Sequence, residues 1–329
     1  MQPEHRPKAD TNAPDAALPA QLPVRSPQGH KGTFGTVLVV GGCSAGTRRM
    51  IGAPALAAMA ALRAGAGLAR LLVPTPILDA AIAIAPSATG HALAVDADGA
   101  IIPHLAAEAF DTHSSDANCL VVGPGLGDGP GPTALALRAV QHADVPVVVD
   151  ADALNCLADL PDLTPDVRAA AILTPHPGEY RRLADALRIK HDPTNETSRT
   201  AAAEALAQRL GVIVALKGAR TVVSDGQRTW TCRHQCPALA TAGTGDVLAG
   251  LIAGLVAQFV PPLAYLRLPR RPADRPLDPW QATCLAVEAH ALAGQRWADR
   301  SKATGGMLAS ELADQLPPIL ESLRKSPGP

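Results

Sequence analysis

The stretch 238-ALATAGTGDVLAGLIAGLVAQ-258 decides the fold prediction, because a turn of small residues, Gly243-Thr244-Gly245, runs directly into an apolar helix pattern. The first N–H groups of a helix have no partner within the helix, and they carry a partial positive charge. Glycines let the backbone approach a bound anion closely. The stretch therefore predicts a helix N-terminus that binds a phosphate.

Asp246 follows this turn and needs its own explanation, because a carboxylate would repel a phosphate at rest. The position makes sense if the carboxylate removes a proton from a hydroxyl that attacks the phosphate, while the N–H groups hold the developing charge. The alternative is a first-turn Asp that only caps the helix, which is worth about 1 kcal/mol.

The rest of the chain alternates short apolar runs with Ala-rich helix patterns. Continuous apolar runs are typical of strands buried on both faces of a parallel sheet. Such runs lie at 36–42, 69–74, 119–124, 145–152, 170–175 and 211–218. Helix patterns cover 53–65, 132–142, 178–188, 198–210, 244–259, 279–299 and 305–323, and Asp225-Gly226 predicts a hairpin between 220–226 and 227–232. The alternation predicts an α/β fold whose sheet is covered by helices on both faces.

Several polar or glycine-rich segments follow predicted strand ends, where ligands bind in such folds. Lys217-Gly218 suits a second phosphate contact, or is a solvent-facing lysine before a turn. In 173-LTPHPGEY-180, His176 could hydrogen-bond a substrate and Glu179 could hold Mg²⁺ through water, or the segment is an ordinary helix start.

Two further strand ends carry the same ambiguity. The glycines of 123-GPGLG-127 allow close approach of a bulky ligand, or they form a tight turn. Asp150 and Asp152 could join a metal or water network, or one of them could be a helix N-cap.

Composition narrows the class of protein. The 329 residues carry a net charge of −1 and 2% aromatic residues, which argues against a nucleic-acid partner. No apolar run reaches the roughly 18–20 residues of a membrane span. The six cysteines are scattered, which indicates reduced, cytoplasmic usage, and Cys232-x₃-Cys236 is a weak metal pattern. We expect a polar, Pro-rich tail at 1–28 and one catalytic domain at 29–329, with a Pro/Arg-rich loop insertion at 261–279.

Taken together, the segments KGxxG, GAPxLAAxAALRxGAG, GPGLG, DADALN, LTPHPGE, KG and ATAGTGDVLAGLIAGLxAQ resemble the ADP-dependent NAD(P)H-hydrate dehydratase family. The likeness runs from Lys31 to Gln258 and into the helical C-terminus. His176 stands where related kinases usually carry Asn. The resemblance implies a ribokinase-like three-layer α/β/α sandwich with a mostly parallel central sheet.

The resemblance also implies a reaction and its residues. ADP would drive dehydration of (S)-NADHX and (S)-NADPHX to NADH and NADPH, with release of AMP and phosphate. Asp246 would be the base, and the amides of Gly243, Thr244 and Gly245 the anion hole. The hydrate would touch Ala53, Gly125, His176 and Asp246, and the nucleotide would touch Lys217, Gly218, Ala219, Arg220, Thr221 and Gly245.

The family further implies Mg²⁺ with the phosphates, a homotetramer and an NAD(P)HX epimerase as functional partner. The epimerase is often fused upstream; the tail expected here is too short to contain it, so we expect a separate protein. Two alternatives remain open. One is a ribokinase-like vitamin-precursor kinase. The other is a weakened nucleotide-binding protein, because 235-QCPA-238 stands where the family commonly has Gly-Asn-Pro-Gly.

Overall fold

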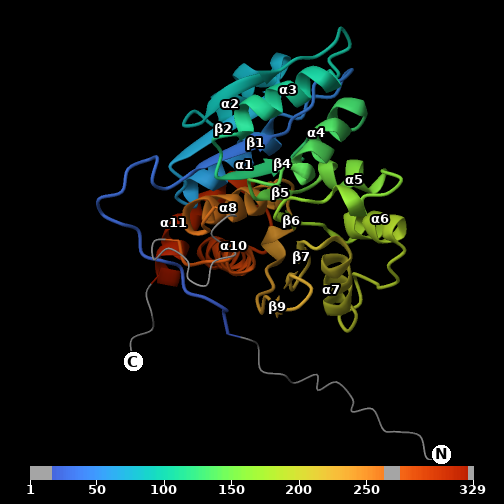
Figure 1. Ribbon diagram of the computed structural model, residues 1–329. Helices are drawn as coiled ribbons and strands as arrows, with labels where there is room; N and C mark the ends of the chain where they lie inside the picture. Colours follow the sequence, from blue (N-terminus) through green and yellow to red (C-terminus); the bar gives the residue numbers. More distant parts are fainter. Residues whose placement is uncertain (1–16, 263–274, 325–329) are drawn as a thin grey trace, which may run out of the picture.

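The continuous apolar runs form buried strands in the computed structural model, which describes residues 17–262 and 275–324 (Figure 1). The strands are β1 (Thr36–Val40), β2 (Leu68–Pro74), β3 (Thr89–Leu93), β4 (Cys119–Val122), β5 (Val147–Val149), β6 (Ala171–Leu173), β7 (Ile213–Leu216), β8 (Val222–Ser224) and β9 (Thr229–Thr231). They form one nine-stranded sheet in the order β3-β2-β1-β4-β5-β6-β7-β8-β9. Strands β1 to β7 are parallel, and β8 and β9 complete the sheet as an antiparallel hairpin.

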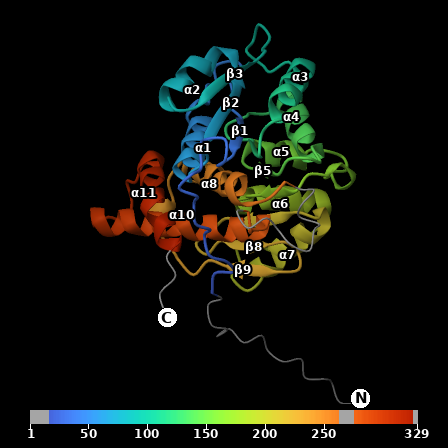
Figure 2. The ribbon, with the colours of Figure 1, turned by 60° about the vertical axis from the view of Figure 1, so that its left-hand side comes forward.

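Helices cover both faces of this sheet. They are α1 (Gly52–Arg63), α2 (Leu78–Ile84), α3 (Pro103–Ser114), α4 (Pro130–Gln141), α5 (Asp152–Ala158), α6 (Pro177–Leu187), α7 (Arg199–Leu210), α8 (Thr244–Phe259), α10 (Pro279–Ser301) and α11 (Ala309–Arg324). Figure 2 shows α1, α10 and α11 on one side and α4 and α5 on the other.

Alternate residues of the strands point into two separate hydrophobic cores. Val37 and Val39 of β1 belong to the core beneath α1, α8, α10 and α11, and Leu38 and Val40 belong to the core beneath α3 to α7. Because successive strand residues face opposite sides, two cores require apolar residues at every position. The expected α/β fold with a mostly parallel sheet between two helical layers is confirmed.

Four elements were missing from the sequence prediction. They are the edge strand β3 and the helices α2, α3 and α5. Helices α2 and α5 are each 7 residues long, too short for a helical repeat to stand out. Helix α11 begins at Ala309, four residues after the start at residue 305 that the sequence predicted.

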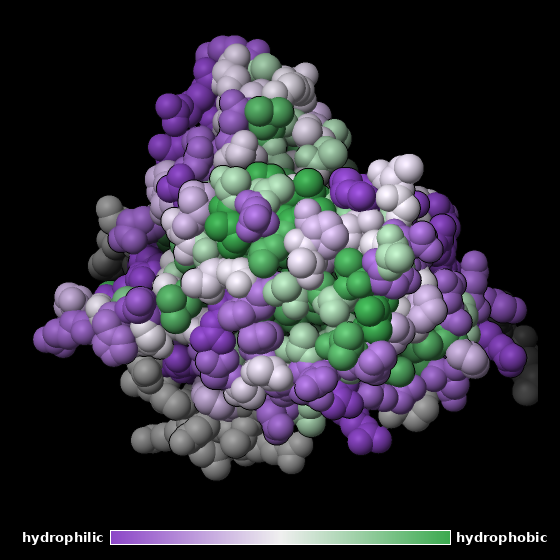
Figure 3. Space-filling view, turned by 90° about the horizontal axis from the view of Figure 1, so that it is seen from above, coloured by the Kyte–Doolittle hydropathy of each residue, from purple (hydrophilic) through white to green (hydrophobic). Residues whose placement is uncertain are grey.

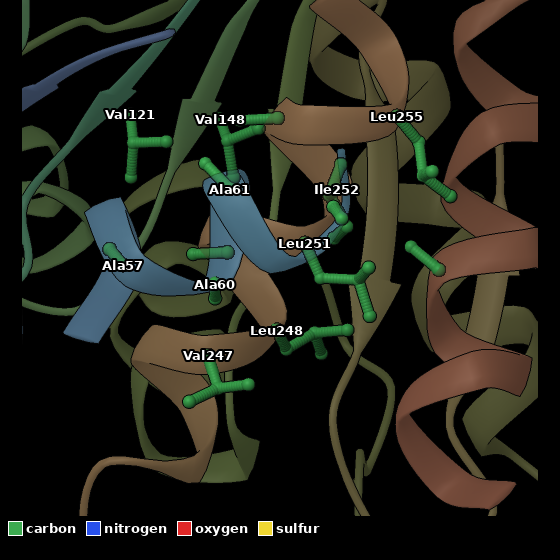
Figure 4. Close-up of a cluster of buried hydrophobic side chains, with 14 of the residues drawn as sticks. Ala57, Ala60, Ala61, Val121, Val148, Val247, Leu248, Leu251, Ile252 and Leu255 are labelled. Atoms are coloured by element: carbon green, nitrogen blue, oxygen red, sulfur yellow. The ribbon is translucent and has the colours of Figure 1, made fainter. Parts of the chain in front are cut away.

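The helices α1 and α8 pack closely because small residues line their contact. An added Cβ at Gly250 would lie 2.0 Å from the carbonyl oxygen of Ala57. Figure 4 shows α1, with Ala57, Ala60 and Ala61, next to α8, with Val247 and Leu251. Close packing along this contact holds the N-termini of both helices at the same end of the sheet.

The expected N-terminal tail is in contact with the domain over its described part. Leu22 is buried within the first core, and its N–H donates to the carbonyl oxygen of Leu323. Arg25 donates to the Gly65 carbonyl and to the side chain of Gln258. The prediction that the tail extends to residue 28 is therefore wrong for residues 17–28, which contact the domain through Leu22 and Arg25.

The loop expected at 261–279 lies mostly outside the described residues, at 263–274. Its last part belongs to the domain, because Leu277 is buried and Asp278 caps α10 with its side chain. On the face seen in Figure 3, apolar residues gather near the middle and hydrophilic residues surround them. No helix in the described part of the chain has the length and apolar composition of a membrane-spanning segment.

Candidate active site

At the N-terminus of α8 the sequence predicts free amides at Gly243, Thr244 and Gly245; among the described residues, those of Gly243 and Gly245 have no backbone acceptor, and that of Thr244 has one. Gly243 is the N-cap with φ of 91°, a conformation that favours glycine. The Thr244 amide donates to the Thr241 carbonyl at 3.4 Å, and the Val247 amide donates to the Gly243 carbonyl at 3.1 Å. Within the described part of the chain, the amides of Gly245 and Asp246 have no backbone acceptor. These two amides are thus available to an anion, whereas the Thr244 amide is already engaged.

Lys217 lies next to these amides, at the carboxyl end of β7. An added Cβ at Gly245 would lie 3.5 Å from the Lys217 Nζ. The ammonium group pairs with Asp150 at 2.7 Å and with Glu179 at 3.7 Å. Burial opposes its charge, but the carboxylates of Asp150, Glu179 and Asp246 outweigh burial and raise the pKa of Lys217. The lysine remains a cation beside the free amides.

Asp150 holds Lys217 in place from the end of β5. Its carboxylate is buried and also accepts a hydrogen bond from the Thr174 hydroxyl at 2.7 Å. The next residue, Ala151, has φ of 51°, which a non-glycine residue rarely adopts. This turn directs Asp152 to the glycine-rich segment after β4, where Oδ2 accepts from the Gly127 N–H at 2.8 Å. Neither aspartate is the N-cap of α5, so that alternative is wrong.

Asp246 lies among these charges. Burial, followed by the negative charge of Asp150, raises the pKa of its carboxyl to about 7, although Lys217 lowers it. Burial also raises the pKa of Glu179 to about 7, against the opposing charge of Lys217. Two carboxyl groups therefore titrate near neutral pH around one lysine, which is typical of sites that transfer protons.

His176 and Glu179 form the start of α6 as a reciprocal cap. Nδ1 of His176 accepts from the amides of Gly178 and Glu179 at 2.9 and 3.3 Å, and the His176 amide donates to Glu179 Oε2 at 2.7 Å. Burial and the charge of Lys217 lower the pKa of His176, so its ring is neutral. The helix-start interpretation is thus correct, and the same pair also contacts the lysine of the site.

The two small residues expected to contact the hydrate lie side by side. An added Cβ at Gly125, where φ is 60°, would lie 3.3 Å from the Cβ of Ala53 and 3.0 Å from that of Met50. The turn that contains Gly125 also contacts Asp152, because the Gly127 N–H donates to its carboxylate. The charge of Asp152 in turn raises the pKa of Asp246. The segments after β1, β4 and β5 thus meet near the N-terminus of α8.

A cavity of about 430 Å³ opens on the other side of Gly245. Its lining residues include Lys217, Gly218, Ala219, Thr221 and Gly245, which are five of the six expected nucleotide contacts. The side chain of Arg220 instead donates to the Cys232 carbonyl and pairs with Glu196 at 3.8 Å. Asp246 is not a lining residue of this cavity. Its carboxyl group is influenced by the charges of Asp150 and Glu179, and it directly follows Gly245, which does line the cavity.

Sequence reasoning missed part of the cavity wall. His234 contacts buried Glu288 at 2.9 Å, and Nε2 of His290 lies 2.8 Å from the Thr244 carbonyl oxygen. Both Glu288 and His290 lie on α10, which was interpreted only as a helix. Two titratable residues inside the apolar run 284-CLAVEAHALAG-294 were the signal that could have identified them.

A cavity at the carboxyl ends of parallel strands, closed by a glycine-rich helix N-terminus, defines the ribokinase-like class of nucleotide-binding α/β proteins. Comparison with known families goes further. The family model of NAD(P)H-hydrate dehydratase matches residues 37–318, so the chain belongs to that family.

Individual relatives agree. The ADP-dependent (S)-NAD(P)H-hydrate dehydratase of Xanthomonas campestris is 35% identical over 312 residues, covering 94% of this chain and 95% of that protein. The bifunctional NAD(P)H-hydrate repair enzyme of Salinibacter ruber is 41% identical over 254 residues, which are 76% of this chain but 44% of that protein. The chain spans about half the length of the bifunctional relatives it matches, 53% for that of Moorella thermoacetica.

Solved structures show the same fold. The ADP/ATP-dependent NAD(P)H-hydrate dehydratase of Bacillus subtilis, co-crystallized with ATP/Mg²⁺, superposes with a TM-score of 0.71 at 28% identity, over 95% of this chain and 100% of that one. The hydroxyethylthiazole kinase protein of Pyrococcus horikoshii, with a TM-score of 0.55 at 18% identity over 89% of this chain and 91% of that one, shares the fold alone.

Proposed function

We propose that this protein dehydrates (S)-NADHX and (S)-NADPHX to NADH and NADPH, using ADP and releasing AMP and phosphate. The observation that carries the proposal is the position of Asp246. Its carboxyl group has a pKa of about 7 under the influence of burial, Asp150 and Lys217. Asp246 directly follows Gly245, which has a free amide, lies next to the Lys217 ammonium group and lines the cavity. Family membership supports the same reaction.

In the first step, the Asp246 carboxylate accepts the proton of the hydrate's hydroxyl group. The hydroxyl oxygen forms a bond to the β-phosphorus of ADP, and the bond from that phosphorus to the bridging oxygen breaks to release AMP. Negative charge on the phosphoryl oxygens is stabilised by the amides of Gly245 and Asp246 and by the ammonium group of Lys217. Asp150 keeps this lysine charged and oriented.

In the second step, the phosphorylated hydrate eliminates phosphate. The C–O bond breaks, a proton leaves the neighbouring ring carbon, and the reduced nicotinamide forms. Phosphate leaves more readily than hydroxide, which explains why a nucleotide is consumed in a dehydration. The same amides and lysine stabilise the departing phosphate.

We expect Mg²⁺ with the phosphates of the nucleotide, with Glu179 contacting it through water. Among the described residues, no group of three or more His, Cys, Asp and Glu side chains could hold a metal ion. Both oxygens of Glu179 already contact His176, at 2.7 and 3.3 Å. A metal ion would therefore enter bound to phosphate oxygens, where it would neutralise charge, and no step above depends on it.

A coupled absorbance assay tests this function. Purified protein, (S)-NADHX or (S)-NADPHX, Mg²⁺ and either ADP or ATP are mixed, and the reduced-nicotinamide absorbance is followed. We expect absorbance to rise with ADP, with one AMP formed per reduced nicotinamide. No rise with either nucleotide would refute the proposal. ATP consumption with a hydroxymethyl heterocycle instead would identify a vitamin-precursor kinase.

Three further features are proposed from the family resemblance. An NAD(P)HX epimerase would supply the S epimer, the protein would be a homotetramer, and it would act in the cytoplasm. Light scattering on the purified protein tests the tetramer. Addition of an epimerase to a mixture of epimers tests the partnership, because it should convert partial dehydration into complete dehydration.

A further inference from the structure

His290 reaches across the cavity wall to the helix that carries the anion-binding amides. It lies on α10, and its Nε2 is 2.8 Å from the carbonyl oxygen of Thr244, the first residue of α8. It is also one of the residues that line the cavity expected to hold the nucleotide. The contact therefore joins α10 to the N-terminus of α8 at the edge of the cavity.

The protonation state of His290 follows from its surroundings. Burial lowers the pKa of the imidazole to about 4, so the ring is neutral at physiological pH. A carbonyl oxygen can only accept a hydrogen bond, so Nε2 carries the proton and donates it. His290 is thus a neutral donor fixed on one carbonyl group.

That carbonyl group belongs to the same peptide unit as the N–H of Gly245. A hydrogen bond accepted by the carbonyl oxygen of an amide polarises the unit and strengthens its N–H as a donor. The Gly245 N–H has no backbone acceptor in the described part of the chain, so the strengthened donor is available to a ligand. The neighbouring Thr244 hydroxyl is occupied elsewhere, because its single hydrogen is within hydrogen-bond distance of the carbonyl oxygens of Leu239, at 2.8 Å, and Thr241, at 2.9 Å.

We infer that His290 is a positioning residue for the β-phosphate of ADP, acting through the Thr244–Gly245 peptide unit to orient and polarise the Gly245 amide. The inference rests on the proposed function, because it assigns the β-phosphate to this amide. A purely structural contact would affect binding of the whole nucleotide, whereas the role inferred here affects binding of the β-phosphate alone.

Three substitutions at His290 separate the role of its hydrogen-bond donor from the role of its bulk. His290→Gln keeps an N–H donor that can reach the carbonyl oxygen. His290→Asn keeps a polar amide on a side chain one carbon shorter, which withdraws the donor. His290→Leu removes the donor and keeps the bulk. His142→Leu is the matched control, because His142 is another part-buried histidine, which contacts Ser114 at 3.2 Å and the ring of Phe110 and is not a lining residue of the cavity.

Calorimetry with ADP and AMP is the first measurement, because AMP lacks the β-phosphate. We expect His290→Leu and His290→Asn to weaken ADP binding by about tenfold, the order of one hydrogen bond, with AMP binding changed less than about twofold. His290→Gln and His142→Leu should bind both nucleotides as the unsubstituted protein does. Thermal unfolding shows whether each variant is folded. If His290→Leu does not fold, His290→Asn alone serves as the variant that lacks the donor.

Dehydration kinetics form the second measurement. We expect kcat with ADP to fall about tenfold or more in the Leu and Asn variants and to be largely retained in the Gln variant. Equal loss of ADP and AMP affinity would show that His290 only shapes the cavity, and unchanged ADP affinity in both variants lacking the donor would likewise overturn the inference. If the unsubstituted protein dehydrates neither hydrate, the proposed function fails, while the ADP–AMP comparison still tests His290.

Discussion

The carboxyl group of Asp246 titrates near pH 7 because burial and neighbouring carboxylates raise its pKa to about 7. A general base works only when unprotonated, so we expect kcat/KM of the dehydration to rise as pH increases through about 7. Asp246→Asn should lower kcat by about 10²-fold or more, since a general base contributes about that much. Steady-state rates between pH 5.5 and 8.5, a span of about 1.5 units on either side of the pKa, measure both effects.

Asp79→Asn is the matched control for that substitution. Asp79 is an exposed acid in the first turn of α2, so it represents an aspartate that only stabilises a helix start. It should leave the rate and its pH profile unchanged. If Asp246→Asn behaves like Asp79→Asn, residue 246 is a helix-start acid and the mechanism is wrong.

The same raised pKa has a consequence for stability. An unfolded Asp carboxyl has a pKa of about 3.9, and in the folded protein that of Asp246 is about 7. Between these values the folded state holds a proton that the unfolded state has lost, so stability is highest at the acidic end and falls as pH rises through 7. Asp246→Asn removes this titration and should raise the melting temperature at pH 8 by at least about 2 °C.

Thermal unfolding at pH 5 and pH 8 measures this effect. The gain in melting temperature should be larger at pH 8, because the buried charge is present only there. A variant that is less stable than the parent at pH 8 would mean that the Asp246 carboxylate is stabilised in the folded protein, contrary to the raised pKa.

Residues were predictable from sequence where they lie in a glycine- or proline-containing turn at a strand end or helix start. Asp246 and Lys217 adjoin a glycine, Gly125 lies in 123-GPGLG-127, and His176 lies between two prolines. The structure brings each of them to the same edge of the sheet. His290 was not predictable in this way, because its role depends on α10 lying against the N-terminus of α8. That packing is a property of the tertiary structure, and nothing in the local sequence around His290 encodes its partner.

Among elements, the contact of α1 with α8 sets the spacing of the site, because Ala53 lies in the first turn of α1 and Asp246 in the first turn of α8. An added Cβ at Gly250 would lie 2.0 Å from the Ala57 carbonyl oxygen, so Gly250→Ala must push the helices apart. We expect it to destabilise the protein by about 1–3 kcal/mol, the range for overpacking, and to lower activity as well. Urea unfolding and the dehydration rate measure the two effects.

Gly305→Ala is the control, because an added Cβ there would meet nothing within 4 Å. It should leave both quantities nearly unchanged. Alanine favours a helix over glycine by about 1 kcal/mol. If Gly250→Ala stabilises the protein, helix propensity outweighs the close contact and α1 can move freely against α8.

Elements with a marked apolar pattern were predicted, including the three-residue strands β5 and β6, whereas the 12-residue helix α3 was missed. The 16 residues of α8 carry a repeating apolar pattern that identifies a buried helix, whereas β3, TGHAL, is an edge strand with one buried residue. Edge strands are covered on fewer sides, so their sequences are less constrained. Of the missed elements, β3, α2 and α3 contribute no residue to the predicted site, whereas α5 begins at Asp152, whose charge acts on Asp246.

At the scale of the whole molecule, the alternation of strands and helices was enough to predict the layered sheet, but not how the ends of the chain pack. Polar and proline-rich composition predicted a tail up to residue 28. A single buried leucine within it, Leu22, is instead part of the core shared with α11. Composition averages over a segment, so it cannot detect one apolar side chain that fits a distant helix.

Leu22 therefore provides a test of how far the domain extends. Its side chain is 2% exposed, and its backbone N–H donates to the Leu323 carbonyl at 3.4 Å, so it joins two segments from opposite ends of the chain. Leu22→Ala should lower the free energy of unfolding by about 2–5 kcal/mol, as for other buried leucines. Val24→Ala, at a side chain that is 82% exposed, should change it by less than about 0.5 kcal/mol. Urea unfolding of both variants decides between the alternatives: equal midpoints would mean that the segment around Leu22 is a dispensable tail after all, whereas a selective loss at Leu22 means that the domain begins before residue 22.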